Sequence, residues 1–281
     1  MYLPRLIAAL LLLGQVVLAH ADMPPTLGDV PYGPAAEQRF DFYAPPQGRD
    51  APLIVMVHGG GWRRGDKEMG RVVDNKVARW VPRGIAFASI NYRMQPTAAP
   101  LDQARDVARA LAALQRDAAK LGIDRDNIVL MGHSAGAHLI ALLAARPDLQ
   151  DEAGVKTWRG TVLLDSGALD VPAIMNGRHL PLYDRAFGSN PADWLAASPY
   201  QQLRQASGPL LAVCSSRRLN ACPQAGNFVA KAKGLGTQAA VLPLDKTHAE
   251  INAQLGEEAA YTAEVERYLG NWSPAFAQRL R

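Results

Sequence analysis

The sequence has few cysteines and few charges, and each shortage excludes a class of protein. Two cysteines are too few to staple a small disulfide-rich scaffold or to build a cysteine-rich zinc module. Charged residues make up 20% of the 281 residues and hydrophobic residues 48%, a balance that excludes a disordered chain, a coiled coil and a multi-span membrane protein. The length is sufficient for a single α/β domain with a large core.

The charge balance also gives little indication of a partner. Lysine and arginine number 30 against 26 acidic residues, and the pairs Arg63-Arg64 and Arg217-Arg218 are isolated rather than part of a basic stripe. A nucleic-acid partner is therefore not expected. His133 and His138 are five positions apart with no glutamate in an HExxH arrangement, so no metal site is predicted. The composition does not determine the oligomeric state.

The N-terminal residues have the pattern of a secretory signal peptide. Arg5 precedes an apolar run over 6–13, and Ala19-His20-Ala21 fits the small-x-small site at which signal peptidase cuts. A membrane anchor is the alternative, but the apolar run falls short of the roughly 20 residues that span a bilayer. We expect residues 1–21 to be removed and the mature chain, 22–281, to be periplasmic or secreted without stable membrane association. In an oxidising compartment Cys214 and Cys222 would form a disulfide rather than remain free thiols.

From about residue 38 onward, apolar runs alternate with amphipathic stretches. This alternation predicts an α/β fold, with a mostly parallel central sheet and helices on both faces. No internal repeat or linker interrupts it, so a single domain is expected. The predicted strands are 39–43, 53–57, 85–91, 128–131, 161–164, 209–213 and 239–242, and the predicted helices are 101–121, 135–145, 228–235 and 257–269.

Residues 171–200 break the alternation with four prolines among apolar and aromatic side chains. An insertion of this length is typical of a lid or a small cap over a binding site, and a packed surface excursion is the alternative. Aromatic residues in and near such a cap would line the site, although ordinary core packing explains them equally well. The candidate substrate-binding residues are Trp62, Tyr92, Tyr183, Phe187 and Trp194.

The strongest local motif is GHSAG at 132–136, directly after one predicted strand and directly before a helix. A sharp turn between strand and helix exposes the serine oxygen above the sheet, and the flanking glycines allow the close packing that this turn needs. Ser134 is therefore the candidate nucleophile. Its alternative role is that of a helix cap.

The second motif is HGGGW at 58–62, immediately after the strand predicted over 53–57. Consecutive glycines let backbone N–H groups approach a ligand closely. Such groups stabilise a developing oxyanion, and each donor contributes on the order of 3 kcal/mol in a transition state. The oxyanion-hole candidates are Gly60, Gly61, Trp62 and Ala135. A phosphate-binding loop is the rival, but the GxGxxG spacing and the Walker lysine are both missing.

Elimination selects one histidine as the general base. His20 leaves with the signal peptide, and His58 belongs to the glycine loop. His133 and His138 are too close to Ser134 in sequence to approach it from across the site, and His179 lies in the insertion. His248 follows the last predicted strand in a short loop, where a base can reach Ser134 from the carboxyl edge of the sheet.

The HGGGW motif, Asn91-Tyr92-Arg93 after the next strand, GHSAGAH and a late histidine together resemble the α/β-hydrolase fold. Within this fold they resemble serine esterases of the HGGG-type carboxylesterase branch and its kynurenine-formamidase-like and feruloyl-esterase-like members. The resemblance covers roughly residues 38–272. It implies a carboxylic ester hydrolase that acts on a small-molecule ester through an acyl-enzyme on Ser134, without a cofactor.

The acid of the predicted triad departs from the pattern of most relatives. They carry it in the loop after the penultimate strand, where this sequence has no carboxylate and has arginine instead. Some members place the acid at the end of the preceding strand, which here is Asp165. Asp170 is the main alternative, Asp245 a weaker one, and Asn220 or no acid at all remains open.

Two other functions remain open. The same motifs fit an arylformamidase-type amidase. A non-catalytic binding protein on a hydrolase scaffold is the second alternative, and its only support is the missing carboxylate in the usual loop.

Overall fold

The computed structural model describes residues 23–46 and 48–281, so the predicted signal peptide, 1–21, lies outside the described residues. Eight strands form one sheet in the order β1-β2-β4-β3-β5-β6-β7-β8. Antiparallel pairs join β1 to β2 and β2 to β4, and every pair from β4 to β8 is parallel. The predicted mostly parallel sheet is therefore confirmed. The strands are β1 (Leu27–Pro31), β2 (Arg39–Tyr43), β3 (Ala51–Val57), β4 (Ala86–Ile90), β5 (Ile123–His133), β6 (Gly160–Leu164), β7 (Leu210–Ser215) and β8 (Ala239–Leu244).

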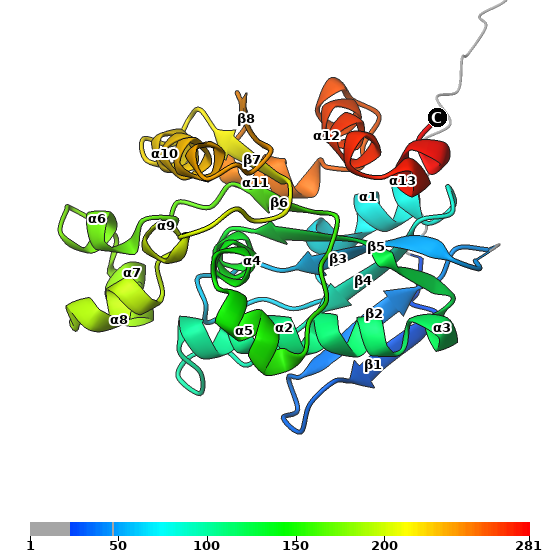
Figure 1. Ribbon diagram of the computed structural model, residues 1–281, viewed down its shortest axis with the longest axis horizontal. Helices are drawn as coiled ribbons and strands as arrows, with labels where there is room; N and C mark the ends of the chain where they lie inside the picture. Colours follow the sequence, from blue (N-terminus) through cyan, green and yellow to red (C-terminus); the bar gives the residue numbers. More distant parts are fainter. Residues whose placement is uncertain (1–22, 47) are drawn as a thin grey trace, which may run out of the picture.

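Helices cover both faces of this sheet, as expected (Figure 1). The larger ones are α1 (Gly70–Trp80), α2 (Pro100–Arg116), α4 (Ala135–Ala145), α10 (Ala221–Gly234) and α12 (Ala260–Trp272). The shorter ones are α3 (Ala118–Leu121), α5 (Pro147–Ala153), α6 (Val171–Met175), α7 (Pro181–Phe187), α8 (Pro191–Ala196), α9 (Pro199–Gln202), α11 (His248–Ala253) and α13 (Pro274–Arg279). No helix of the described residues is both long and apolar enough to cross a membrane.

The alternation of side chains along β3 divides the core into two layers. Leu53, Val55 and Val57 pack with helices α2, α4 and α10 on one face, while Ile54 and Met56 pack with α1, α12 and α13 on the other. Because successive strand residues point to opposite faces, a continuously apolar strand must be buried on both. Every residue of β3 is buried, as the apolar run predicted.

The structure refines several predicted elements. The helix predicted over 101–121 is divided at Asp117 into α2 and α3. The sequence patterns did not predict α1, the edge strand β1, or the short helices α5, α11 and α13. His248 begins α11 rather than lying in a loop.

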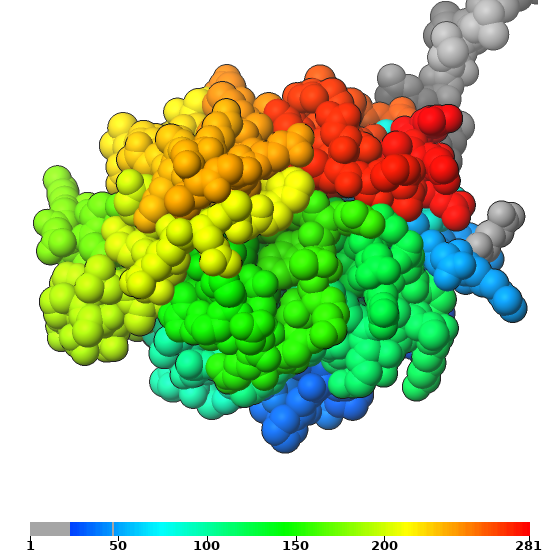
Figure 2. Space-filling view, viewed as in Figure 1, coloured from blue at the N-terminus to red at the C-terminus, as the bar shows by residue number. Residues whose placement is uncertain are grey.

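The insertion forms four short helices, α6 to α9, which each begin with a proline at the first or second position. They gather at one end of the molecule, coloured green to yellow-green (Figures 1 and 2). Proline suits these positions because the first N–H groups of a helix have no partner within it. The insertion is thus an ordered part of the molecule beside the carboxyl ends of the strands.

Candidate active site

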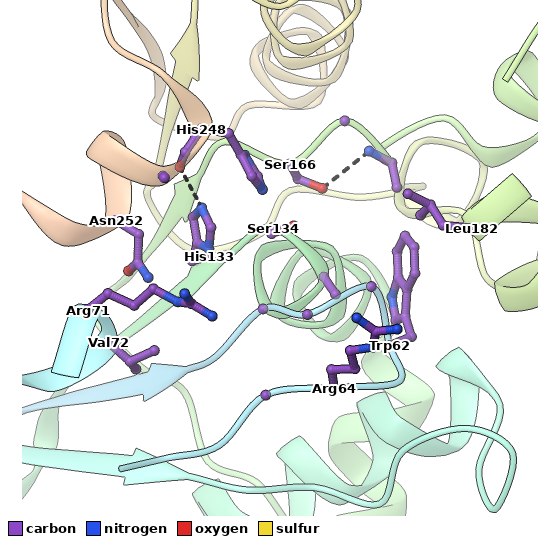
Figure 3. Close-up of a pocket in the computed structure, with 18 of the residues that line it drawn as sticks. Trp62, Arg64, Arg71, Val72, His133, Ser134, Ser166, Leu182, His248 and Asn252 are labelled. Atoms are coloured by element: carbon purple, nitrogen blue, oxygen red, sulfur yellow. Dashed lines mark hydrogen bonds between the residues drawn. The ribbon is translucent and has the colours of Figure 1, made fainter. Parts of the chain in front are cut away.

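Parallel strands end at one edge of the sheet, and the loops that follow them surround a cavity of about 550 Å³. Its wall contains residues that are far apart in sequence but meet because their strands are neighbours (Figure 3). Ligand sites of open α/β sheets lie at this edge. The contributing loops supply Trp62 after β3, Ser134 after β5, Ser166 after β6, Arg218 after β7 and His248 after β8.

Ser134 occupies the turn between β5 and α4 with a positive φ of 55° and a ψ of −117°. A non-glycine residue in this conformation is strained, and strain of this kind is concentrated at functional sites. The turn packs so tightly that a Cβ on Gly132 would lie 2.7 Å from the backbone of Gly136. A Cβ on Gly136 would overlap the carbonyl oxygen of Val57. Both glycines of the motif are therefore required by close packing, as predicted.

The glycine loop after β3 lies against this turn. Gly60, Gly61 and Trp62 all have positive φ values, of 127°, 62° and 60°. The loop turns back on itself, because the N–H of Arg64 donates to the carbonyl of Gly60 at 3.1 Å. None of the loop and turn hydrogen bonds among the described residues uses the N–H groups of Gly61, Trp62 or Ala135. These groups border the cavity beside Ser134 and remain available to an oxyanion.

A helix start fixes the position of His248. Thr247 and Glu250 form a capping box, in which each side chain accepts a hydrogen bond from the other residue's backbone N–H. His248 is thus the first residue of α11, with its ring about one third exposed on the cavity wall. The capping box holds the imidazole on a short regular helix rather than on a free loop.

Asp165 meets the imidazole from the end of β6. Its Oδ2 lies 2.6 Å from Nδ1 of His248, and its Oδ1 accepts a hydrogen bond from the N–H of Ser215 at 2.8 Å. The carboxylate is fully buried, and the residue has a positive φ of 56°. Burial by itself would raise the pKa of Asp165. The hydrogen bonds from His248 and Ser215, together with the charge of Arg218, outweigh burial and lower this pKa to about 2. Asp165 is therefore ionised at neutral pH.

Arg218 occupies the loop in which most relatives carry the acid. Its Nη1 donates to Asp165 Oδ2 at 2.7 Å and to the Asp165 carbonyl at 3.0 Å, and it lies 3.1 Å from His248 Nδ1. The arginine thus contacts the same carboxylate oxygen as the histidine. The predicted disulfide is present between Cys214 and Cys222, and it closes the segment that carries Arg218.

The alternative acids lie elsewhere. Asp170 caps α6 by accepting from the N–H of Ala173 at 3.1 Å, and Asp245 pairs with Arg217 at 2.6 Å. Asn220 precedes α10 without making a side-chain cap. Among these candidates and Asp165, only Asp165 contacts the ring of His248.

Two buried histidines, His133 and His138, pack against residues of the site. His133 packs its ring 4.4 Å from that of His248 and lies 3.0 Å from the His248 carbonyl oxygen through Nε2. His138 accepts a hydrogen bond from Trp62 at Nδ1 and donates from Nε2 to the carbonyl of Ala197. Burial lowers the pKa of His133 to about 3, with the charge of His248 as a second cause, and burial lowers that of His138 to about 4. Both rings are neutral at neutral pH. His133 contacts His248, and His138 joins Trp62 of the glycine loop to the carbonyl of Ala197.

The aromatic residues predicted to bind substrate divide into two groups. Trp62 and Tyr183 line the cavity. Tyr92 is buried against His58, with 4.6 Å between the two ring centroids. Phe187 packs on Trp62, with 4.9 Å between their ring centroids. Trp194 donates to the carbonyl of Gly188 within the insertion. These last three residues lie outside the cavity lining, so the prediction that they bind substrate is wrong: Tyr92 packs within the body of the molecule, Phe187 between the insertion and Trp62, and Trp194 within the insertion.

Several cavity residues did not emerge from the sequence. Arg64, Arg71 and Asn252 line the wall without a local motif to mark them. Arg64 lies in the loop after β3, while Arg71 on α1 and Asn252 on α11 reach the cavity through tertiary packing. A separate cluster of three carboxylates has spacing suited to a cation, formed by Asp29, Asp41 and Glu68. Lys67 already neutralises this cluster, since its Nζ lies within 3.0 Å of each of them.

A family model described as BD-FAE matches residues 40–165, the segment from β2 to β6 that contains both glycine motifs and Asp165. A probable isoprenylcysteine alpha-carbonyl methylesterase of Oryza sativa subsp. japonica is 31% identical over 51% of this chain and 34% of its own length. Esterase LipQ of Mycobacterium tuberculosis is 38% identical over 41% of this chain and 28% of its own length. Kynurenine formamidase of Danio rerio is 28% identical over 54% of this chain and 49% of its own length. The matches thus span less than half of each of these curated relatives.

Solved structures extend the similarity over most of the chain. Esterase B from Lactobacillus rhamnosis superposes with a TM-score of 0.73 at 18% identity, covering 92% of this chain and 89% of that one. Thermogutta terrifontis esterase 2 phosphonylated by sarin superposes with a TM-score of 0.69 at 22% identity, covering 83% and 89%. At these identities the superpositions establish the fold. The chain therefore has the α/β-hydrolase fold, and its sequence resembles serine esterases of that fold across the segment that holds the two glycine motifs.

Proposed function

We propose that this protein is an exported serine hydrolase that cleaves small to medium carboxylic esters through Ser134, His248 and Asp165. One observation carries the proposal: an ionised, buried Asp165 lies 2.6 Å from Nδ1 of His248, on the wall of the cavity that also contains the strained Ser134. A carboxylate in this position fixes the imidazole tautomer with the proton on Nδ1. The other ring nitrogen is then free to act as a base.

The proposed reaction has two halves. Ser134 Oγ attacks the ester carbonyl carbon while its proton passes to Nε2 of His248, and the carbonyl π electrons move onto the oxygen. The tetrahedral oxyanion accepts hydrogen bonds from the backbone N–H groups of Gly61 or Trp62 and of Ala135. Collapse of this intermediate breaks the bond to the alcohol, which leaves with the proton from His248. Water, deprotonated by His248, then attacks the acyl-enzyme in the same way and releases the acid and free Ser134.

The fold's own dipoles assist this chemistry. The N–H groups at the first turn of α4 point toward Ser134, so the positive end of the helix dipole faces the developing negative charge. Asp165 stabilises the imidazolium that forms in each half of the reaction. No step in this scheme requires a cofactor.

Covalent labelling tests the proposal. We expect a fluorophosphonate probe to label the folded protein stoichiometrically and the Ser134→Ala variant not at all. Hydrolysis of p-nitrophenyl acetate and butyrate should be lost in the same variant. A folded wild-type protein that neither reacts with the probe nor hydrolyses these esters would instead be a binding protein on a hydrolase scaffold.

Arylformamide hydrolysis is the second candidate. The 28% identity to the Danio rerio kynurenine formamidase favours it, and the same nucleophile and oxyanion groups would serve an amide carbonyl. Comparing kcat/KM on N-formylkynurenine with kcat/KM on p-nitrophenyl butyrate separates the two candidates. A preference for the formamide would replace the ester assignment.

Export is the remaining part of the proposal. The disulfide between Cys214 and Cys222 supports an oxidising compartment. N-terminal sequencing of the protein recovered from its native compartment should begin at Asp22. A chain that retains Met1 in a reducing compartment would overturn export while leaving the hydrolase assignment intact.

A further inference from the structure

The charge of the cavity wall is one-sided. Three arginines, Arg64, Arg71 and Arg218, line it together with His133 and His248, and no aspartate or glutamate of the described residues does so. Nearly equal numbers of acidic and basic residues occur in the whole sequence. The positive lining is therefore a property of this cavity rather than of the chain as a whole.

Two of these arginines retain an uncompensated charge. Arg218 is committed to Asp165, at 2.7 Å. In contrast, neither Arg64 nor Arg71 forms an ion pair with any described residue. The protein contact of the Arg71 guanidinium is with the sulfur of Met69 at 3.7 Å. Both side chains are exposed, so their N–H donors are accessible to a bound molecule.

A buried polar group without a partner lies beside Arg71. Asn252 is 1% exposed and lines the cavity, and its Oδ1 has no hydrogen-bond partner among the described residues. Buried polar atoms are satisfied in most native proteins, and an amide oxygen only accepts hydrogen bonds, so this exception indicates a missing donor such as a water molecule rather than a carboxylate. Figure 3 shows Asn252 and Arg71 on the His133 side of the cavity, with the Arg71 side chain extending toward its middle.

Lys76 fixes these two residues relative to each other. Its buried Nζ donates to the carbonyl of Asn252 at 2.6 Å and to the carbonyl of Arg71 at 3.2 Å. Asn75, its neighbour on α1, donates to the carbonyl of Ala253 at 2.7 Å. The first half of α1 and the end of α11 are thereby joined, and the wall that they form is preorganised for a ligand.

The opposite wall has another character. Trp62 and Leu182 lie across the cavity from Arg71 and Asn252, with Ser134 between the two sides (Figure 3). Tyr183 and Leu180 add further apolar surface. Arg64 lies on this side too, next to Trp62, so each side of the cavity presents one of the two arginines (Figure 3). A substrate whose scissile bond lies at Ser134 therefore has one part near Arg71 and the other near Trp62 and Arg64.

From this arrangement we infer that the substrates are esters in which one part carries a carboxylate, which Arg71 or Arg64 binds. The inference rests on the proposed hydrolase function and deepens it. Guanidinium groups suit this role because their planar N–H donors match both oxygens of a carboxylate. The free carboxylate belongs to either the acyl or the alcohol part of the ester, and the experiment distinguishes these two sources.

The test compares isosteric ester pairs at low salt. For the acyl side, benzyl hydrogen succinate is compared with benzyl 4-methylpentanoate, in which an isopropyl group replaces the carboxylate. For the alcohol side, carboxymethyl butyrate is compared with isobutyl butyrate. The readout is the ratio of kcat/KM for the anionic ester to kcat/KM for the neutral one. In one of the two pairs this ratio should exceed its value for the Arg64→Gln, Arg71→Gln double variant by about two- to fivefold per arginine, the range of exposed ion pairs.

A matched control is available on the same loop. Arg63 neighbours Arg64 in sequence but does not line the cavity, so Arg63→Gln removes the same charge at a different place. The ratio should be unchanged in Arg63→Gln, and it should fall in the wild type when NaCl is raised to 0.5 M, because salt screens exposed charges. Using the ratio within each variant cancels differences in leaving-group reactivity between the two esters.

The outcomes separate this inference from the proposed function. Equal ratios in the wild type and the double variant for both pairs, with neutral esters hydrolysed normally, would overturn the inference alone. Failure to hydrolyse any of the four esters, together with absence of fluorophosphonate labelling, would overturn the hydrolase assignment and the inference with it. A ratio that falls equally in Arg63→Gln would show that overall charge rather than the cavity wall is responsible, and it would also overturn the inference.

Discussion

Arg218 donates a 2.7 Å hydrogen bond to Asp165 Oδ2, the same oxygen that lies 2.6 Å from Nδ1 of His248. The guanidinium therefore has two opposed effects on the proposed triad. It holds the carboxylate in place and keeps it ionised, which favours a well-oriented imidazole. Its positive charge, 3.1 Å from Nδ1, also opposes the imidazolium that forms when Ser134 attacks.

Removing this charge should change the pH profile. In Arg218→Gln we expect the acid limb of kcat/KM to move to higher pH, because loss of a nearby positive charge favours the protonated imidazole. The pH optimum becomes narrower on its acid side, and turnover at the optimum falls because Asp165 loses a donor. Steady-state kinetics between pH 5 and 9 measure both effects.

Arg217→Gln is the control for this substitution. Arg217 is adjacent in sequence, but it pairs with the exposed Asp245 and does not line the cavity. The same displacement of the acid limb in both variants would mean that general charge, not contact with Asp165, is the cause. An unchanged pH profile in Arg218→Gln would contradict the conclusion that the charge of Arg218 opposes formation of the His248 imidazolium.

The identity of the acid can be tested with two matched variants. Asp165→Asn should lower kcat by on the order of 10⁴-fold, because an amide at this position stabilises the wrong imidazole tautomer and offers no charge. Asparagine tolerates the positive φ that Asp165 adopts, so the variant should fold normally. Asp170→Asn keeps an oxygen that can cap α6 and should retain activity. Circular dichroism and kcat measurements on both variants decide the assignment, and the reverse pattern would show that Asp170 is the acid.

The sequence predicted the parts of this site whose signals are local. Gly132 and Gly60 are required by backbone approach within a few residues, whereas Gly136 is required by contact with Val57 of the neighbouring strand. The apolar strand β3 is readable because both of its sides are buried. The end of β6 was selected for the acid by topology, since neighbouring parallel strands end side by side. The helical start at Thr247 was readable too, because Thr-x-x-Glu is a capping-box signature, yet the segment was predicted as a loop.

Other parts were out of reach because tertiary contacts decide them. The edge strand β1 is mostly exposed and contains both glycine and proline, so it lacks the apolar alternation of a strand. Tyr92 and Phe187 are aromatic residues of the kind that often contact ligands, but neighbouring rings cover them. Arg71 lies at the cavity because α1 packs against α11, in a contact where Lys76 donates to the carbonyl of Asn252, 176 residues further along the chain.

The disulfide should contribute to stability and to the position of Arg218. Its eight-residue separation corresponds to roughly 2–3 kcal/mol of unfolding free energy in the chain-entropy model. Urea unfolding of the Cys214→Ser, Cys222→Ser variant should show this decrease. Because the bond closes the segment that carries Arg218, kcat/KM should fall as well. Wild-type protein treated with a reductant should behave like the variant, and equal stability of the two oxidation states would refute the prediction.

Acid should destabilise the fold well above the pKa of its carboxylates. His133 and His138 have pKa values of about 3 and 4 in the folded state, and burial lowers the pKa of His58 as well. Below pH 6.5 the unfolded chain therefore binds protons on these rings that the folded chain does not. Between pH 6.5 and about 4 the unfolding free energy therefore falls, by up to about 1.4 kcal/mol per pH unit for each ring. Asp165 cannot cause this change. Its contribution is fully present above the unfolded value near 4 and is lost only as pH falls toward about 2.

The His138→Gln variant separates the contributions of the His133 and His138 rings to this acid sensitivity. The amide can donate to the carbonyl of Ala197 and accept from Trp62, so it replaces both hydrogen bonds of the imidazole without titrating. Urea unfolding at pH 8, 6 and 5 should show a smaller pH slope in the variant than in the wild type, because one imidazole fewer takes up a proton on unfolding. The buried groups His133, His58 and Lys76, whose pKa values are also lowered by burial, keep their contributions in both proteins. Equal slopes in the two proteins would mean that His138 is protonated in the folded state, contrary to its burial. A wild-type stability that does not change between pH 8 and 5 would exclude both histidines as the source of acid sensitivity.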